Sequence, residues 1–125
     1  MDKKRVLVID DEKEFTELVK LNLEETGRYE VREENKASHG FAAAKQFKPD
    51  LILLDILMPD IGGAEVAYQL KNDKDTKNIP ITFLTAVITK EETEHQSSII
   101  GGHSFIAKPV TAKQLIDAIE KIIGV

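Results

Sequence analysis

Five polar residues in this sequence each come at the end of a short apolar run. Asp10 and Asp11 follow "RVLVI", Asp55 follows "DLILL", Thr85 follows "ITFL" and Lys108 follows "FIA". A carboxylate in apolar surroundings costs free energy unless it is paired, protonated or bound to a metal. We therefore expect the three acids to share a ligand or a partner.

Three carboxylates in one crevice would favour a bound cation. Two unit charges about 5 Å apart repel by about 3 kcal/mol at an effective dielectric constant near 20. An oxygen-only site without His or Cys favours a hard ion, and a few carboxylates with open water positions favour Mg²⁺ over Ca²⁺, with Mn²⁺ as a substitute. The cation, the Lys108 ammonium and the Thr85 hydroxyl would stabilise charge on a phosphoryl group, and Asp55 would be free to attack phosphorus.

The segments that must position these residues alternate between strands and helices. Continuous apolar runs are typical of strands buried on both faces of a parallel sheet, which predicts strands over residues 5–10, 50–56, 79–86 and 103–109. The more polar "YEVREEN", residues 29–35, alternates as an edge strand does. This alternation predicts an α/β fold with right-handed crossovers.

Helical spacing of apolar residues predicts the intervening helices. The repeating residues are Phe15, Leu18, Val19 and Leu23 before Gly27, then Phe41, Ala44 and Phe47 before Pro49, then Val66, Ala67 and Leu70 after Gly63. The last helix, 111–123, opens with Thr111 and Gln114 at capping-box spacing. Between Val87 and Gly101 we predict a loosely held helix, because its polar stretch 89–98 offers little to pack on a sheet; a solvated surface loop is the alternative.

Composition limits the classes of protein that the chain can represent. At 125 residues it is predicted to form one domain, and its net charge of −5 argues against a broad nucleic-acid surface. No apolar run approaches a membrane span and no signal peptide is visible, which predicts a cytoplasmic protein. The absence of Cys excludes thiol chemistry and thiolate metal sites.

The segments "VLVIDDE", "LILLDILMPDIGG", "TFLTA" and "FIAKP" resemble the receiver domain of bacterial two-component response regulators, of the chemotaxis-regulator-like kind. Met58, Pro59 and Gly63 match the family pattern Asp-x-x-Met-Pro-x-x-x-Gly. The resemblance covers nearly the whole chain. It implies a flavodoxin-like, doubly wound, five-stranded parallel sheet in the order 2-1-3-4-5, flanked by five helices. It also implies a signalling domain that catalyses its own phosphorylation and dephosphorylation, rather than an enzyme.

The same resemblance implies the roles of the acids. Asp55 is the expected phosphoacceptor. Asp10 and Asp11 are expected to hold Mg²⁺ together with Asp55 and the backbone carbonyl of Leu57. The crevice would then lie where the first and third strands end side by side, which is where ligands bind in open α/β sheets.

The resemblance further implies roles for residues of the last two strands. Lys108 and Thr85 are expected to contact the phosphoryl group. Phe105 occupies the aromatic switch position, which moves inward when Thr85 shifts toward a phosphoryl oxygen. The peptide bond between Lys108 and Pro109 is expected to be cis, since a structural cis peptide is normally an X-Pro bond.

The partners implied by the resemblance are proteins. A sensor histidine kinase or a histidine phosphotransfer protein would donate the phosphoryl group. A downstream protein or an output domain would bind the face formed by the fourth helix, the fifth strand and the fifth helix. Ile116 and Ile123 lie partly off the main apolar stripe of that last helix, so they either widen its core contact or belong to the partner face.

Two other functions are compatible with an acid at a strand end. A phosphatase of the haloacid-dehalogenase type also uses an Asp nucleophile and Mg²⁺, but it requires Asp-x-Asp where this chain has Asp10-Asp11-Glu12, and it needs a cap domain. A degenerate receiver acting as a scaffold is disfavoured because no acid position is missing. We also expect the chain to be a single receiver domain, residues 1–125, without an output domain, either stand-alone or part of a longer protein.

Overall fold

A single mixed sheet forms the centre of the computed structural model, which describes residues 3–56, 58, 61–85, 99–100, 103–107 and 111–123. The strands are β1 (Lys4–Ile9), β2 (Tyr29–Glu34), β3 (Leu51–Asp55), β4 (Ile81–Thr85), β5 (Ile99–Ile100) and β6 (His103–Ala107). The described helices are α1 (Lys13–Glu25), α2 (Gly40–Phe47), α3 (Gly63–Lys71), α5 (Ala112–Ile123) and a short 3-10 turn, η1 (Ala37–His39). No described helix has the length and apolar character that a membrane span requires.

The five long strands are parallel and follow the predicted order. The sheet runs β2-β1-β3-β4-β6-β5, so the fifth predicted strand is β6. β5 is a sixth strand that we did not predict, and it pairs antiparallel with β6 at the edge of the sheet. Its two residues, Ile99 and Ile100, are β-branched and suit a strand better than the end of a helix. The helix predicted between Val87 and Gly101 is therefore wrong at Ile99 and Ile100, and the rest of that segment lies outside the described residues.

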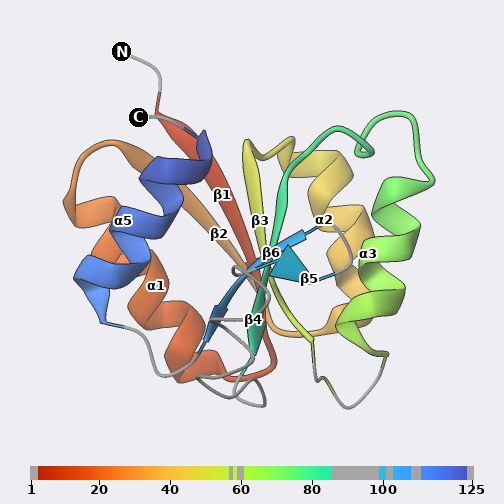
Figure 1. The fold of residues 1–125 in the computed structure, drawn as a ribbon, viewed down its shortest axis with the longest axis horizontal. Helices are drawn as coiled ribbons and strands as arrows, with labels where there is room; N and C mark the ends of the chain where they lie inside the picture. Colours follow the sequence, from red (N-terminus) through yellow and green to blue (C-terminus); the bar gives the residue numbers. More distant parts are fainter. Residues whose placement is uncertain are drawn as a thin grey trace.

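Helices cover both faces of the sheet (Figure 1). α1 and α5 pack on one face, and α2 and α3 pack on the other. β1 supplies both cores by alternation: Val6 and Val8 belong to the α1/α5 cluster, whereas Leu7 and Ile9 belong to the α2/α3 cluster. The continuous apolar run of β1 is therefore explained by burial on both faces.

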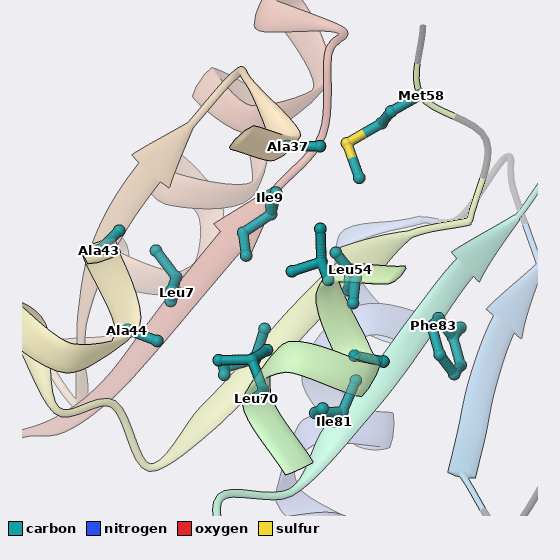
Figure 2. Packing of buried hydrophobic residues seen from close by; sticks show 13 residues of the cluster. Leu7, Ile9, Ala37, Ala43, Ala44, Leu54, Met58, Leu70, Ile81 and Phe83 are labelled. Carbon is teal, nitrogen blue, oxygen red and sulfur yellow. The ribbon is translucent and has the colours of Figure 1, made fainter. Parts of the chain in front are cut away.

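The α2/α3 cluster is shown in Figure 2, where side chains from both helices meet the strands. Its members include Leu7, Ile9, Leu54, Leu70, Ile81 and Phe83, all nearly or fully buried. Small residues at Ala43 and Ala44 let α2 approach the sheet closely. Met58, just after β3, also packs into this cluster, so the chain beyond Asp55 is anchored to the core.

The predicted first, second, third and last helices are present as α1, α2, α3 and α5, with one difference in the buried face of α1. Val19 and Leu23 are buried, but Leu18, which the helical spacing also favoured, is 51% exposed. The buried stripe instead includes Thr16, a polar residue, so the core-facing side of α1 is turned relative to the predicted one. We did not predict that change, because apolar spacing alone favours Leu over Thr.

The start of α5 has the predicted capping box. The Thr111 N–H donates to Gln114 Oε1 at 3.0 Å, and the Gln114 N–H donates to Thr111 Oγ1 at 3.1 Å. Leu115 and Ile119 are fully buried against the sheet. Ile116 and Ile123 are partly buried and pack against the same α1/α5 cluster, which supports the core reading of these two side chains.

Tyr29 begins β2 and fills part of the α1/α5 core. Its side chain is fully buried, and within the described part of the chain its hydroxyl has no hydrogen-bond partner. Burial raises the pKa of Tyr29 above 10.0; the positive charge of Arg28 lowers it and the carboxylate of Glu120 raises it further. Arg28 and Glu120 themselves form an ion pair at 2.9 Å, which joins the start of β2 to α5.

β2 forms one edge of the sheet, as predicted from its polar alternation. One outward backbone donor of this strand is satisfied by a side chain: the Val31 N–H donates to Glu24 Oε2 of α1 at 3.1 Å. The other edge strand, β5, covers β6. The β2 edge is therefore partly capped by a side chain, and the opposite edge is limited to the two residues of β5.

Candidate active site

Three carboxylates meet at the carboxyl edge of the sheet. Ile9 of β1 pairs with Leu54 of β3, so the residues that follow them, Asp10 and Asp55, end neighbouring strands. One carboxylate oxygen from each of Asp10, Asp11 and Asp55 lies within 4.8 Å of the others. The predicted convergence of the acids is therefore present in the structure.

The three acids differ in their exposure to solvent. Asp10 is fully buried, Asp55 is 6% exposed and Asp11 is exposed. Charges at such separations repel by about 3 kcal/mol per pair at an effective dielectric constant near 20. A hard divalent cation would replace this repulsion with attraction, and an oxygen-only donor set of this kind suits Mg²⁺. The exposed Asp11 gives such an ion a side open to water.

Asp10 is held through its backbone and its side chain. Its N–H donates to the Glu34 carbonyl at 3.0 Å, which extends the β1–β2 pairing by one residue. Its Oδ1 accepts the Glu12 N–H at 2.9 Å in a local turn. Its carbonyl accepts a hydrogen bond from Asn35 Nδ2 at 2.9 Å. Asp10, the most buried of the three acids, is thus held by hydrogen bonds at its backbone nitrogen, its carbonyl oxygen and its Oδ1.

Asp55 is positioned by the sheet before it and by α3 after it. The Ile56 N–H donates to the Leu84 carbonyl at 3.1 Å, so β3 and β4 stay paired beyond Asp55. The Gly63 N–H donates to the Ile56 carbonyl at 2.8 Å. A Cβ at Gly63 would overlap the Asp55 carbonyl oxygen, so only glycine fits here without a shift of the backbone.

The other predicted site residues are described only in part. Thr85 is the last residue of β4 and pairs with Ala107 of β6, which brings the ends of these strands together next to β3. Phe105 lies in β6 opposite Phe83 of β4. The structure describes the backbone of these residues, and the contacts of the Thr85 and Phe105 side chains stay predictions.

Three predicted positions lie outside the described residues. These are the Leu57 carbonyl, the Lys108 ammonium and the peptide bond between Lys108 and Pro109. Their roles as a metal ligand, a phosphoryl contact and a cis peptide stay predictions. Lys108 directly follows β6, so it would start from the same edge of the sheet as the acids.

Three polar residues near the site were missed by the sequence interpretation. Asn35, Thr16 and Glu33 form a hydrogen-bonded chain that ends on the Asp10 carbonyl. Only Asn35 has a signal that is visible in the sequence. Asn35 directly follows the edge strand, as Asp10 follows its own strand, whereas the burial of Thr16 in α1 is seen only in the structure.

The chain is similar to known proteins over nearly its whole length. The family model described as the response regulator receiver domain matches residues 6–120. The Pseudomonas aeruginosa protein PilH is 33% identical over 124 residues, which covers 96% of this chain and 98% of that protein. The phosphate regulon transcriptional regulatory protein PhoB of the same species is 35% identical over 120 residues, covering 96% of this chain and 52% of PhoB. The chain thus spans about half the length of PhoB.

Solved structures have the same fold. The receiver domain of the sensor histidine kinase PA1611 from Pseudomonas aeruginosa superposes with a TM-score of 0.82 at 20% identity, covering 99% of this chain and 100% of that one. That receiver domain was solved with a magnesium ion coordinated in its active site cleft. At this level of identity the likeness concerns the fold alone, and it confirms the predicted flavodoxin-like arrangement.

Proposed function

Because the chain belongs to the response regulator receiver domain family, the phosphoacceptor domains of two-component signalling, we propose that Asp55 is the residue that accepts the phosphoryl group. The observation that carries this assignment is the meeting of the Asp10, Asp11 and Asp55 carboxylate oxygens within 4.8 Å at one edge of the sheet. Asp55 is the member at the end of β3, near the middle of the sheet and nearly buried. A nucleophile there is held firmly and lies beside the two other acids.

In the proposed reaction, a carboxylate oxygen of Asp55 attacks phosphorus on a phosphohistidine. The new oxygen–phosphorus bond forms as the nitrogen–phosphorus bond breaks, and its electron pair returns to the imidazole nitrogen, which takes up a proton. Hydrogen bonds of the Ile56 N–H and carbonyl restrain the backbone after Asp55, so the carboxylate attacks from a fixed position. Lys108 and Thr85 would contact the phosphoryl oxygens. We also propose that the domain catalyses its own dephosphorylation.

The acids fit a bound Mg²⁺ by their chemistry. Asp10, Asp11 and Asp55 present oxygen ligands only, and the Leu57 carbonyl would add another. When bound, Mg²⁺ supplies positive charge that offsets the charge of the acids and of the incoming phosphoryl group. The buried and fixed Asp10 would set the position of the ion, and the exposed Asp11 would complete its coordination from the solvent side.

The proposed partners and location follow from the family. A sensor histidine kinase or a histidine phosphotransfer protein would donate the phosphoryl group, and a downstream protein or output domain would bind the face of the fourth helix, β6 and α5. We propose no direct contact with nucleic acid or membrane, and a cytoplasmic location. We further propose that residues 1–125 form a single receiver domain.

Labelling with a small-molecule phosphodonor in Mg²⁺ tests the assignment. Wild-type protein is incubated with acetyl phosphate, and intact-mass spectrometry measures the fraction that gains one phosphoryl group. Asp55→Asn is expected to abolish labelling, since an amide cannot form the acyl phosphate. Asp75→Asn is the matched control: it removes an exposed carboxylate whose one ion pair within the described part of the chain is with Lys45 at 3.6 Å, so labelling should equal that of the wild type.

Each alternative function predicts a different result. Equal labelling of the wild type and Asp55→Asn would refute Asp55 as the acceptor. Repeated turnover of a phosphomonoester substrate would instead indicate a phosphatase of the haloacid-dehalogenase type. Failure of the wild type to be labelled at all, with Mg²⁺ present, would indicate a degenerate receiver.

A further inference from the structure

A chain of polar side chains links the edge strand of the sheet to the acids. Asn35 Nδ2 donates to the Asp10 carbonyl at 2.9 Å and to Thr16 Oγ1 at 2.9 Å. Thr16 Oγ1 lies 2.8 Å from Glu33 Oε1 and 3.0 Å from the Lys13 carbonyl. Thr16 is fully buried, so this chain replaces water as the partner of these polar groups.

The donors and acceptors of this chain are consistent with one another. A carbonyl only accepts, so the amide atom of Asn35 that faces Asp10 must be the NH₂ group, and its two hydrogens serve Asp10 and Thr16. The Thr16 hydroxyl then accepts from Asn35 and donates its single hydrogen, with the Glu33 carboxylate as the shorter of its two acceptors. The orientation of each group is therefore determined by its neighbour.

We infer that Asn35 and Thr16 are positioning residues for the acid pair Asp10–Asp11, and thereby for the Mg²⁺ that this pair holds; the inference rests on the proposed function. The Asp10 carbonyl belongs to the planar peptide that connects Asp10 to Asp11. A hydrogen bond to this oxygen restrains the plane of the peptide, and this plane, together with the φ angle of Asp11, sets the direction in which the Asp11 side chain leaves the backbone. The Asp11 side chain is exposed, so few packing contacts restrain it, and its position depends mainly on this peptide.

The two acids are thus positioned in different ways. Asp10 is fixed directly by its own N–H and Oδ1, through Glu34 and Glu12. Asp11 is fixed indirectly, through the carbonyl that Asn35 binds. Groups that orient metal ligands from outside the coordination shell typically change metal affinity by about 10-fold to 100-fold when removed. Because Asn35 acts on a backbone oxygen, the lower end of that range applies.

Calorimetric titration of the unphosphorylated protein with Mg²⁺ tests this inference without any phosphoryl transfer. Asn35→Ala is expected to weaken Mg²⁺ binding by about 10-fold, which corresponds to about 1.4 kcal/mol. Asn72→Ala is the matched control: Asn72 Nδ2 also donates to a backbone carbonyl, that of Tyr68 at 2.8 Å, but at the end of α3 away from the acids. Its Mg²⁺ affinity should equal that of the wild type.

A second pair of variants separates the hydroxyl of Thr16 from its volume. Thr16→Val keeps the shape and removes the hydroxyl, and it should weaken Mg²⁺ binding as Asn35→Ala does. Thr16→Ser keeps the hydroxyl and should restore most of the affinity. At saturating Mg²⁺, Asn35→Ala and Thr16→Val should be labelled by acetyl phosphate at a maximal rate close to that of the wild type, because Asp55 is unchanged. The Mg²⁺ concentration that gives half-maximal labelling should rise in both variants.

The outcomes distinguish this inference from the proposed function. The inference is overturned if Asn35→Ala binds Mg²⁺ as tightly as Asn72→Ala, if Thr16→Ser is as weak as Thr16→Val, or if the wild type binds no Mg²⁺. Should Asn35→Ala fail to fold, as judged by circular dichroism, the Thr16 pair decides alone. Labelling of Asp55→Asn would refute the phosphoacceptor assignment and would leave the Mg²⁺ titrations interpretable.

Discussion

Replacement of Gly63 by alanine tests how closely α3 is packed against the end of β3, where Asp55 lies. The added Cβ would overlap the Asp55 carbonyl oxygen and lie 2.8 Å from the Ile56 Cα. Both are backbone atoms, which cannot rotate away as a side chain can. An extra carbon in a packed site costs about 1–3 kcal/mol, and backbone contacts place this variant near the upper end. Alanine regains at most about 1 kcal/mol of helix propensity, so a net loss of about 2 kcal/mol is expected.

Urea unfolding followed by far-ultraviolet circular dichroism measures this loss. With a denaturant dependence of about 2 kcal/mol/M, the midpoint of Gly63→Ala should fall by about 1 M urea. The neighbouring Gly62 is the control, because a Cβ there would lie 3.8 Å from the Ile56 carbonyl oxygen, an ordinary contact. Gly62→Ala should stay within about 0.5 kcal/mol of the wild type. Equal midpoints for the two variants would refute the steric argument.

Three further changes test the core and the acid crevice. Tyr29→Phe removes a buried hydroxyl and should raise the free energy of unfolding by about 1 kcal/mol, whereas Tyr68→Phe, at an exposed tyrosine, should be neutral. Because burial raises the pKa of folded Tyr29, the unfolded chain ionises more readily, and the free energy of unfolding falls as pH rises above about 10. The wild type should therefore lose more stability between pH 9 and pH 11 than Tyr29→Phe. Leu23→Ala, at a fully buried site, should cost about 2–5 kcal/mol in urea unfolding, and Leu21→Ala, 57% exposed in the same helix, less than about 0.5 kcal/mol. Asp11→Asn should slightly stabilise the protein in Mg²⁺-free buffer, where like charges repel, and added Mg²⁺ should raise its thermal midpoint less than that of the wild type.

The position of the acids was predictable because strand ends and burial are both visible in the sequence. Residues 6–9 before Asp10 and 51–54 before Asp55 are apolar at every position, which indicates burial on both faces and therefore a parallel sheet with helices on each side. In such a sheet the carboxyl ends of neighbouring strands meet at one edge. The capping box of Thr111 and Gln114 was likewise predictable, since it depends on residues only three positions apart.

The features that were not predicted depend on contacts between distant parts of the chain. Which side of α1 faces the sheet depends on the residues that the helix packs against. Thr16 is buried and Leu18 is exposed, and the hydrogen bonds of Thr16 with Glu33 and Asn35 compensate the cost of burying its hydroxyl. β5 depends on pairing with β6 and has too few residues for a periodic pattern. A polar network of this kind leaves no fixed spacing in the sequence.

The protection of both sheet edges has a consequence for self-association. An exposed edge strand is a template on which another chain can add a strand, which leads to aggregation or domain swapping. Here the carboxylate of Glu24 occupies an outward amide of β2, and β5 runs antiparallel along β6 at the opposite edge. Extension of the sheet by a second molecule would have to displace the Glu24 carboxylate at β2, or pair with an edge strand of only two residues at β5. We therefore expect the protein to stay free of edge-to-edge polymers at high concentration, and to meet other molecules through its helices and its loops.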